Sequence, residues 1–492
     1  MEEEKKIIVK LKKEPLKSER EEIKAKRKHK LLIFVLCIVL LITGIGVGYL
    51  TARRFNSIQY VSTSNNKFDE IKDYIENLWL YKNDYDNLDT TLEDKAFYGM
   101  TKFEEDPYTS YMSKEENISF MSGINMNYVG IGVQYYSYND QAIITRVFKE
   151  SPAENAGIKV GDIIKRVNSV SISGKSSDEI KEMVLGEEGS IVGITVERNG
   201  EEIDLMAIRG QVDSTIYVEA DGDCVVLYLM SFGEDTANEC IKYLDEYKDY
   251  NKLIIDLRDN SGGLQSSVEE VAGLFLGDNV VYMQQVYSDG RQTEAKTTSN
   301  AFYDNFENIA IITNANTASA AEVLAICMKE QHDNVTLVGE TTFGKGVVQS
   351  RYTLSDGSTI KITTSEWLSP SGKTINGNGV SPDVEVLLPD LLYMVVPIFE
   401  DNTSYEIDSV SSYVKIAENA LNYLGYYDGR TDGYFDREFQ AALNNYKINN
   451  GLNADGYLNK EIYDLLLSEV SYVYSTDPVR DLQMVKAKEI VG

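Results

Sequence analysis

An uninterrupted apolar run at residues 31–50 constrains this chain more than any other feature of its sequence. Its twenty residues carry no charge, and a helix rising about 1.5 Å per residue would span roughly 30 Å of hydrocarbon with them. A signal peptide has a shorter apolar region, of about 7–15 residues, and a small-residue cleavage site, which is not evident here. Lys and Arg crowd residues 1–30, whereas only Arg53 and Arg54 follow closely. We therefore expect an uncleaved signal anchor, with a cytoplasmic N-terminus and the remainder exported.

The net charge argues against one large class of partner. The 492 residues carry a formal net charge of -30, whereas a protein that binds nucleic acid needs a basic face for the phosphates. We expect no nucleic-acid partner. With 43% hydrophobic residues, the composition is that of globular domains, and the length allows about three of them.

Cysteine and histidine are too sparse for a disulfide framework or a metal site. Cys37 lies in the apolar run, and the exported part holds three cysteines, at positions 224, 240 and 327. One of these three thiols must stay unpaired within the chain. The two histidines, His29 and His332, form no pair at ligand spacing. We therefore predict no metal and no cofactor.

Hydrophobic periodicity divides the chain into segments. Helical spacing marks the region after the tether, and short β-rich runs follow, closing in a hairpin with Asn199-Gly200 at its tip. Near-continuous Ile/Leu/Val runs between helices then predict a buried, largely parallel sheet. The expected segments are a basic cytoplasmic leader (1–30), a transmembrane helix (31–50), a tether (51–66), a helical region (67–116), a β domain (117–210), an α/β domain (211–395), a small helical domain (408–470) and a polar tail (471–492).

Ser319 lies where a predicted strand passes into a predicted helix, in the run Asn314–Glu322. At the start of a helix, the positive end of the helix dipole can stabilise an oxyanion. A lone serine at this position is more often only a capping residue. Ser319 becomes a candidate nucleophile only if a base is available.

Lys345 is the candidate base. His332, the one exported histidine, follows Ser319 by 13 residues at the far end of the same predicted helix, about 20 Å away at about 1.5 Å per residue. A Ser-His-Asp triad is therefore nearly excluded, and a Ser-Lys pair remains. Lys345 lies between two glycines in an apolar setting, which would lower the pKa of its amine. Gln349, four residues on, could hold that amine by a hydrogen bond. The alternative is an ordinary loop lysine.

A paired glycine turn follows the predicted strand at Lys252–Leu257. The backbone N–H groups of Gly262 and Gly263 in this turn could face a developing oxyanion. For two adjacent glycines alone, a simple strand–turn is an equally good interpretation.

These elements together resemble the C-terminal processing (tail-specific) serine peptidase family. The resemblance spans about residues 67–390 and includes five motifs in family order. They are Asp106–Thr109, Asp256–Gly263, Thr317–Glu322, Gly344–Gln349 and Gly377–Asp383. Several motifs over this length are far more specific than one short motif. The resemblance implies a multidomain α/β protein with a PDZ-like β domain at residues 117–210 and a crotonase-like protease core.

The resemblance also implies roles for individual residues. Ser319 would be the nucleophile, Lys345 the general base and Gln349 the residue that orients the lysine. The oxyanion hole would comprise the N–H of Ala320 and that of Gly262 or Gly263. The aromatic stretch usual in the family before Pro-Ser-Gly is altered here to Ser365–Leu368, which bears on the substrate surface beside the pair.

Two flanking modules also resemble known domains. The PDZ-like domain would bind a free C-terminus through backbone N–H groups, with the peptide adding as a strand. Its carboxylate-binding loop would be Tyr128, Val129, Gly130, Ile131, Gly132 and Val133. The segment at 408–470 resembles a small helical peptidoglycan-binding domain, whose Asp-Gly turns would also suit a module that docks protein.

The sequence thus predicts a membrane-anchored serine endopeptidase of the bacterial cell envelope. It would cleave exported proteins near their C-termini through an acyl-enzyme, under PDZ regulation and with peptidoglycan as a partner. The formation of homo-oligomers is an open alternative. The alternative is a catalytically silent, wall-bound PDZ scaffold. A peptidoglycan hydrolase would need paired carboxylates or a zinc site, and the sequence shows no such motif.

Overall fold

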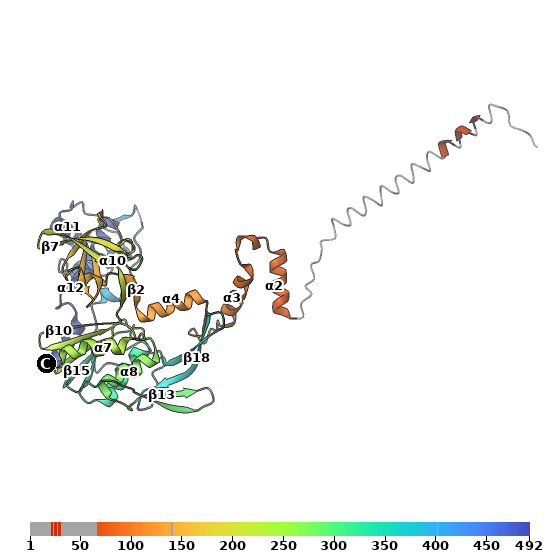
Figure 1. The fold of residues 1–492 in the computed structure, drawn as a ribbon. Helices are drawn as coiled ribbons and strands as arrows, with labels where there is room; N and C mark the ends of the chain where they lie inside the picture. The colour runs from red at the N-terminus through yellow and green to blue at the C-terminus, as the bar shows by residue number, and fades with distance from the viewer. Residues whose placement is uncertain (1–20, 23, 27, 31–65, 139–140, 401) are drawn as a thin grey trace, which may run out of the picture. The chain divides into compact units, whose positions relative to one another are not determined.

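The computed structural model describes residues 21–22, 24–26, 28–30, 66–138, 141–400 and 402–492. Two compact units comprise residues 1–96 and 97–492, and Figure 1 shows the order of their elements. The apolar run at 31–50 and the tether at 51–65 fall outside the described residues. Across the part that is described, we find no helix with the length and apolar character needed to cross a membrane.

The first unit contains the start of the helical region predicted at 67–116. In the second unit this region also holds the strand β1 (Ser110–Met112), and its predicted end falls within α4 (Lys114–Asn125). Asn66 caps the first helix, because its side-chain oxygen accepts a hydrogen bond from the N–H of Asp69 at 2.9 Å. The elements are α2 (Lys67–Leu78), η1 (Lys82–Asp84) and the start of α3 (Leu88–Met100).

The β domain of the second unit is built from a sheet in the order β3-β4-β5-β7-β8, with β6 paired to β5. The predicted hairpin is confirmed, and its tip residues Asn199 and Gly200 both have positive φ, at 55° and 83°. A separate ribbon, β2 with β9, leads into and out of the domain. Its elements are β2 (Asn127–Gly130), β3 (Val133–Tyr138), β4 (Gln141–Val147), α5 (Pro152–Asn155), β5 (Ile163–Val167), β6 (Val170–Ser171), α6 (Ser177–Val184), β7 (Ile191–Arg198), β8 (Glu201–Ile208) and β9 (Gly210–Asp213).

The α/β domain is centred on a sheet in the order β10-β11-β12-β15-β16-β19. Its strands from β11 to β19 run parallel, as predicted from their apolar runs, and β10 is antiparallel at one edge. The elements are β10 (Ile216–Asp221), β11 (Cys224–Leu229), α7 (Thr236–Leu244), η2 (Asp245–Tyr247), β12 (Lys252–Asp256), α8 (Gln265–Leu276), β15 (Asn308–Thr313), α9 (Ala320–Gln331), β16 (Val335–Gly339) and β19 (Val384–Glu385).

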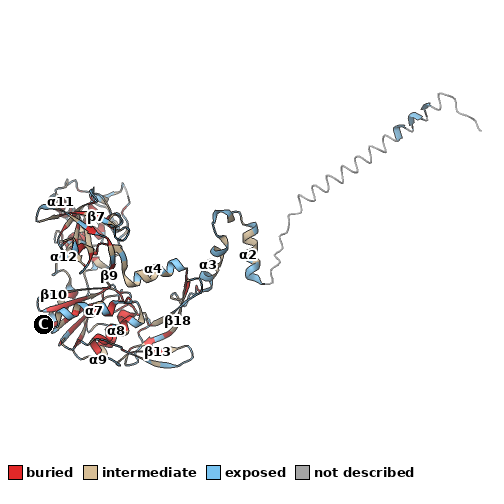
Figure 2. Ribbon diagram, in the orientation of Figure 1, coloured by how far each residue is buried: buried red, intermediate tan, exposed pale blue. Residues whose placement is uncertain are grey.

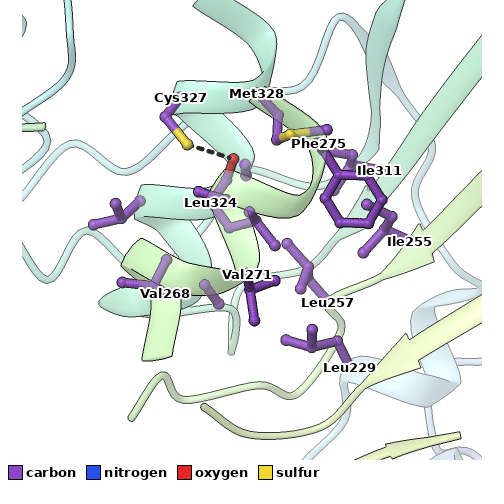
Figure 3. Packing of buried hydrophobic residues seen from close by; sticks show 14 of the residues in the cluster. Leu229, Ile255, Leu257, Val268, Val271, Phe275, Ile311, Leu324, Cys327 and Met328 are labelled. Carbon is purple, nitrogen blue, oxygen red and sulfur yellow. Dashed lines mark hydrogen bonds between the residues drawn. The ribbon is translucent and has the colours of Figure 1, made fainter. Parts of the chain in front are cut away.

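Helices α8 and α9 bury most of their side chains against one face of this sheet. Figure 3 shows Phe275 and Leu324 from these helices packed with Ile255 and Ile311 from the strands. Figure 2 shows the same helices as largely buried. Each fully buried side chain of this size contributes about 1.5–3 kcal/mol. The buried cysteines at 224, 240 and 327 are all free thiols.

The last helix, α13 (Leu482–Val491), packs on the opposite face of the sheet. Its residues Met484, Ala487 and Val491 are buried against strand residues such as Ile254 and Ile312. The polar tail predicted from residue 471 is not present, because α12 (Lys460–Thr476) continues to Thr476 and α13 then covers this face. The apolar positions of α13 have a partner only because the chain returns to the α/β domain.

The strands of a second sheet are interspersed in the sequence with those of the first. This second sheet carries part of the candidate site. Its order is β1-β18-β13-β14, with β17 also paired to β18. The elements are β1 (Ser110–Met112), α4 (Lys114–Asn125), β13 (Val281–Tyr287), β14 (Gln292–Lys296), β17 (Val347–Thr353) and β18 (Thr359–Leu368).

The small C-terminal domain is helical, as predicted, and has its own apolar core. Leu391 and Phe399, which precede the predicted boundary at 408, pack into this core with residues of all three main helices. The elements are η3 (Asp390–Tyr393), β20 (Ser404–Tyr405), α10 (Ser412–Tyr423), α11 (Arg437–Asn449), β21 (Leu458–Asn459) and α12 (Lys460–Thr476).

Candidate active site

Ser319 lies on a strained turn between β15 and α9. Its φ of 56° and ψ of -119° are unusual for a residue with a side chain and cost on the order of 1–3 kcal/mol. A sharp strand-to-helix turn of this kind exposes a nucleophilic serine in other hydrolases. Two bonds hold the turn: Thr317 Oγ1 donates to the carbonyl of Leu257 at 2.9 Å, and the Ala318 N–H donates to that of Asn260, also at 2.9 Å.

The glycine turn lies directly against Ser319. A Cβ built on Gly262 would lie 2.9 Å from Ser319 Cβ and 3.0 Å from the backbone N of Ala320, and its φ is 104°. Only glycine allows this approach. Buried Asn260 fixes the turn, because its Oδ1 accepts the Gly262 N–H at 2.8 Å.

The two glycines differ in what their N–H groups do. The N–H of Gly262 is occupied by Asn260, whereas within the described chain no acceptor is recorded for the N–H of Gly263 or of Ala320. Both Gly263 and Ala320 line the same cavity as Ser319. The geometry therefore favours Gly263 over Gly262 as the partner of Ala320 in an oxyanion hole.

Lys345 is half-buried in the loop before β17. Partial burial lowers the pKa of Lys345, the positive charge of Lys361 lowers it further, and Glu322 opposes the shift. Its Nζ lies 4.7 Å from the centre of the Tyr108 ring. Fully buried Trp367 holds the loop, since its indole N–H donates to the carbonyl of Lys345 at 2.9 Å. The residues Ser365–Leu368, which depart from the family pattern, therefore support the lysine directly.

Glu322 connects the serine turn to the lysine loop. This fully buried carboxylate accepts the backbone N–H of Ser319 at 2.7 Å and that of Lys345 at 2.9 Å. Its other oxygen accepts from Thr342 Oγ1 and from the Gly344 N–H at 2.7 Å. Glu322 lies in the motif Thr317–Glu322, but no role was predicted for it from the sequence. Its spacing of one helical turn from Ser319 was the available signal.

Gln349 lies on β17 beside the lysine loop. Its Nε2 donates to Thr363 Oγ1 at 3.4 Å, and Thr363 in turn donates to Asp106 at 3.0 Å. Asp106 also accepts the N–H groups of Tyr108 and Thr109. The recorded bond of Gln349 thus goes to Thr363 and not to Lys345, and Gln349 borders the cavity into which Lys345 reaches.

A single cavity of about 920 Å³ brings the predicted residues together. Its lining includes all six residues predicted for catalysis and the oxyanion hole: Ser319, Lys345, Gln349, Gly262, Gly263 and Ala320. His332 is absent from this lining. It caps the far end of α9, where its ring lies 3.0 Å from the carbonyl of Phe275. Among the described residues, no cluster of three or more His, Cys, Asp or Glu could hold a metal ion.

Of the predicted carboxylate-binding loop, only Ile131 and Gly132 lie between β2 and β3. The residues at 128–130 belong to β2, which pairs with β9, and Val133 begins β3, so the loop is shorter than predicted. The carbonyls of Ile131 and Gly132 accept the N–H groups of Ala153 and Phe148, whereas in the part of the chain described no acceptor is recorded for the N–H of either loop residue. Gly132 has a φ of 75°, and a Cβ there would lie 2.5 Å from Ser151 Cβ. Strand β3 is at the edge of its sheet. An edge strand beside such a loop can pair with a peptide that adds as a strand, and in this structure β3 is in contact with α12 (Lys460–Thr476).

Comparison with known protein families matches three parts of the chain. Residues 223–386 match the model of peptidase family S41, residues 129–207 match that of the PDZ domain, and residues 411–466 match that of a peptidoglycan binding domain. These ranges fall within the α/β domain, the β domain and the C-terminal helical domain.

Curated relatives match most of the chain. The carboxy-terminal processing protease CtpA of Bacillus subtilis (strain 168) is 32% identical over 471 residues, which cover 94% of this chain and 98% of the relative. A CtpA-like serine protease of Staphylococcus aureus (strain COL) is 32% identical over 452 residues, covering 90% and 89%. Among solved structures, the photosystem II D1 C-terminal processing protease matches at 23% identity and a TM-score of 0.37, covering 65% of this chain and 92% of that one. The chain therefore belongs to the C-terminal processing peptidases of family S41, serine peptidases with PDZ and peptidoglycan-binding domains.

Proposed function

We propose that this protein is a membrane-anchored endopeptidase that cleaves exported proteins near their C-termini, using Ser319 and Lys345. The observation that carries the proposal is the shared cavity. In it, a serine on a strained turn, a half-buried lysine and two backbone N–H groups without a recorded acceptor among the described residues border the same space. Nucleophile, base and oxyanion donors are the groups that acyl transfer requires.

The reaction follows from these positions. Neutral Lys345 takes the proton of the Ser319 hydroxyl as its oxygen attacks the scissile carbonyl carbon. The N–H groups of Gly263 and Ala320 stabilise the resulting oxyanion. The C–N bond then breaks, and the leaving amine takes the proton from Lys345. Water, deprotonated by the same lysine, then attacks the ester carbonyl carbon. The bond from this carbon to Ser319 Oγ breaks, Lys345 returns the proton to Oγ, and the product leaves with a new C-terminal carboxylate.

The remaining domains would direct the enzyme to its substrates. The loop between β2 and β3 would bind a substrate C-terminus and β3, the edge strand of its sheet, would pair with it in place of its present contact with α12. The PDZ domain would then be a regulator of cleavage. The C-terminal domain would bind peptidoglycan. The apolar run at 31–50, with basic residues before it, would anchor the chain in the membrane and place the catalytic part outside the cytoplasm.

The catalytically silent scaffold is the competing function, and one experiment separates the two. The full chain in detergent is incubated with an unstructured protein bearing an apolar C-terminal tail, and fragments are identified by mass spectrometry. We expect chelator-resistant cleavage that Ser319→Ala and Lys345→Ala each abolish. Exposed Ser355 and Lys296 provide matched controls, so Ser355→Ala and Lys296→Ala should cleave normally. Cleavage that survives both active-site substitutions would place the chemistry elsewhere, and no cleavage by the unaltered chain would favour the scaffold.

A further inference from the structure

Two cationic side chains lie directly opposite each other in the wall of the active-site cavity. Arg351 of β17 is the register partner of Lys361 of β18, and both line the cavity that contains Ser319. In an antiparallel sheet, directly opposed residues point to the same face, and two like charges there are destabilising. Packing and strand pairing therefore give no reason for this choice of residues.

Neither cation has a carboxylate partner within the described residues. The recorded contact of Arg351 is with the sulfur of Met121, and Lys361 Nζ lies 4.9 Å from the centre of the Phe120 ring. Asp106 is the acid that acts on the pKa of Lys361, opposing the lowering that burial causes. Its carboxylate already accepts hydrogen bonds from Tyr108, Thr109 and Thr363.

The rest of the cavity is also poor in negative charge, although the whole chain carries a formal net charge of -30. Asp259 is the one acidic residue in the described lining. Its carboxylate accepts the side-chain amides of Asn314 and Asn316, each at 2.9 Å. An acidic protein thus keeps two unpaired cations in the cavity where it would bind substrate.

The cation pair lies close to the catalytic groups. Gln349 precedes Arg351 by two residues on β17 and is paired with Thr363, which follows Lys361 by two residues on β18. Residues two apart on a strand share a face and lie about 7 Å from each other. A substrate that reaches Lys345 past Gln349 therefore passes about 7 Å from the pair.

We propose that Arg351 and Lys361 bind a carboxylate of the substrate inside the active-site cavity. The α-carboxylate at the substrate's C-terminus and the side chain of an Asp or Glu share this chemistry. The inference rests on the proposed peptidase function and specifies its substrates, namely chains with a carboxylate a short distance from the scissile bond. The contact is separate from the PDZ loop, which has no basic residue among Tyr128–Val133.

The test compares three peptides that share a scissile sequence and otherwise lack acidic residues. The first ends in a free carboxylate, the second in an amide, and the third in an amide with one Glu scanned along the tail. The full chain is compared with Arg351→Met, Lys361→Met and Lys296→Met, the last an exposed lysine on β14 of the same sheet. Each kcat/KM is measured on the plateau of that variant's pH profile. The contribution of the PDZ domain is the same in all four proteins. A change in the ratio of kcat/KM between carboxylate and amide peptides therefore reports on the cavity.

We expect the unaltered chain and Lys296→Met to prefer a carboxylate peptide over the plain amide by about tenfold or more, mainly through KM. In Arg351→Met and Lys361→Met, the preference for the Glu peptide should fall toward one, and the preference for the free terminus should fall to the part that the PDZ domain contributes. Loss of preference for the free terminus identifies the α-carboxylate as the ligand, and loss for the Glu peptide identifies a side chain. Since a merely structural role would lower the melting temperature, Tm should not fall in either variant.

Two results would overturn the inference: equal turnover of all three peptides by the unaltered chain, or an unchanged preference in both variants. Peptide binding to the Ser319→Ala chain, followed by fluorescence anisotropy, keeps this test independent of cleavage. In the Ser319→Ala chain, the Kd of the amide peptide divided by the Kd of the carboxylate peptide should fall when Lys361→Met or Arg351→Met is added. If binding discriminates in this way but no peptide is ever cleaved, the proposed peptidase function fails while the carboxylate site stands.

Discussion

The carboxylate of Glu322 accepts the backbone N–H of Lys345 at 2.9 Å, across 23 positions of sequence. The same oxygen accepts the N–H of Ser319 at 2.7 Å. One buried acid thus sets the distance between the turn that carries the nucleophile and the loop that carries the base. Hydrogen bonds to a buried carboxylate are short and strong, so this link fixes the pair before substrate arrives.

Replacing Glu322 with Gln should impair catalysis through this link. An amide presents two donors where the carboxylate presents acceptors, so at least one of the N–H groups of Ser319 and Lys345 or of their neighbours loses its bond. We expect kcat/KM to fall about 100-fold, with a lowered Tm, because each unsatisfied buried group costs about 1–3 kcal/mol. Glu330→Gln is the matched control, since Glu330 lies on the same helix and accepts bonds from Ser371 away from the cavity. Near-normal kcat/KM in Glu322→Gln would contradict this role.

Lys361 should influence the pH dependence of the reaction. Lys345 accepts the Ser319 proton only when neutral, so kcat/KM rises with pH as Lys345 loses its own proton. Burial first, and then the charge of Lys361, lower the pKa of Lys345. Lys361→Met removes the second cause, and we expect the acid limb of the profile to move to higher pH. A profile that coincides with that of Lys296→Met would show that Lys361 does not act on the base.

A side chain at Gly262 should abolish activity. The new Cβ of Gly262→Ala would meet Ser319 Cβ at 2.9 Å, and the φ of 104° disfavours alanine as well. Displacing Ser319 or an oxyanion donor costs about 100- to 1000-fold in kcat. Gly290→Ala tests backbone strain alone, because Gly290 has a φ of 79° but open space around it. Equal kcat in the two variants would refute close packing of the glycine turn on the serine.

The C-terminal helix should stabilise the protease core. Arg258, in the turn after β12, pairs with Asp256 at 2.6 Å and with Asp481, the N-cap residue of α13, at 2.8 Å. Removing one partner of a largely buried ion pair leaves the other uncompensated, and with Asp256 still present we expect Asp481→Asn to cost about 1–3 kcal/mol. Thermal inactivation should therefore occur at lower temperature than in Asp464→Asn, a change on the surface of α12. An unchanged midpoint of thermal inactivation would show that the stability of the core does not depend on α13.

Local patterns predicted much of this fold. The Asn199-Gly200 tip indicated a hairpin because both positions require positive φ, which these residues tolerate. The apolar runs at Lys252–Leu257 and Ile309–Thr313 indicated buried parallel strands, and β12 and β15 are present there with bounds that differ by one residue each. The family motifs identified Ser319 and Lys345, and in the structure both residues line one cavity.

Long-range relationships could not be predicted in the same way. The return of α13 to the sheet depends on long-range contacts, such as the hydrogen bond from Gln483 to Glu340 across 143 positions of sequence. The short segment itself gave no sign of its partner. The opposition of Arg351 and Lys361 depends on the register of β17 and β18, which an irregularity between Val348 and Gln349 shifts. The choice between Gly262 and Gly263 required knowing which N–H group the side chain of Asn260 binds.

The central claim is that Ser319 is a nucleophile activated by Lys345, and covalent labelling tests it most directly. A fluorophosphonate probe loses fluoride when an activated serine oxygen attacks its phosphorus, and peptide mapping by mass spectrometry locates the adduct in the full chain. We predict one labelled serine, Ser319, with labelling abolished in Ser319→Ala and strongly slowed in Lys345→Ala but not in Lys296→Ala. Labelling of another serine, or labelling of Ser319 at an unchanged rate in Lys345→Ala, would contradict the account.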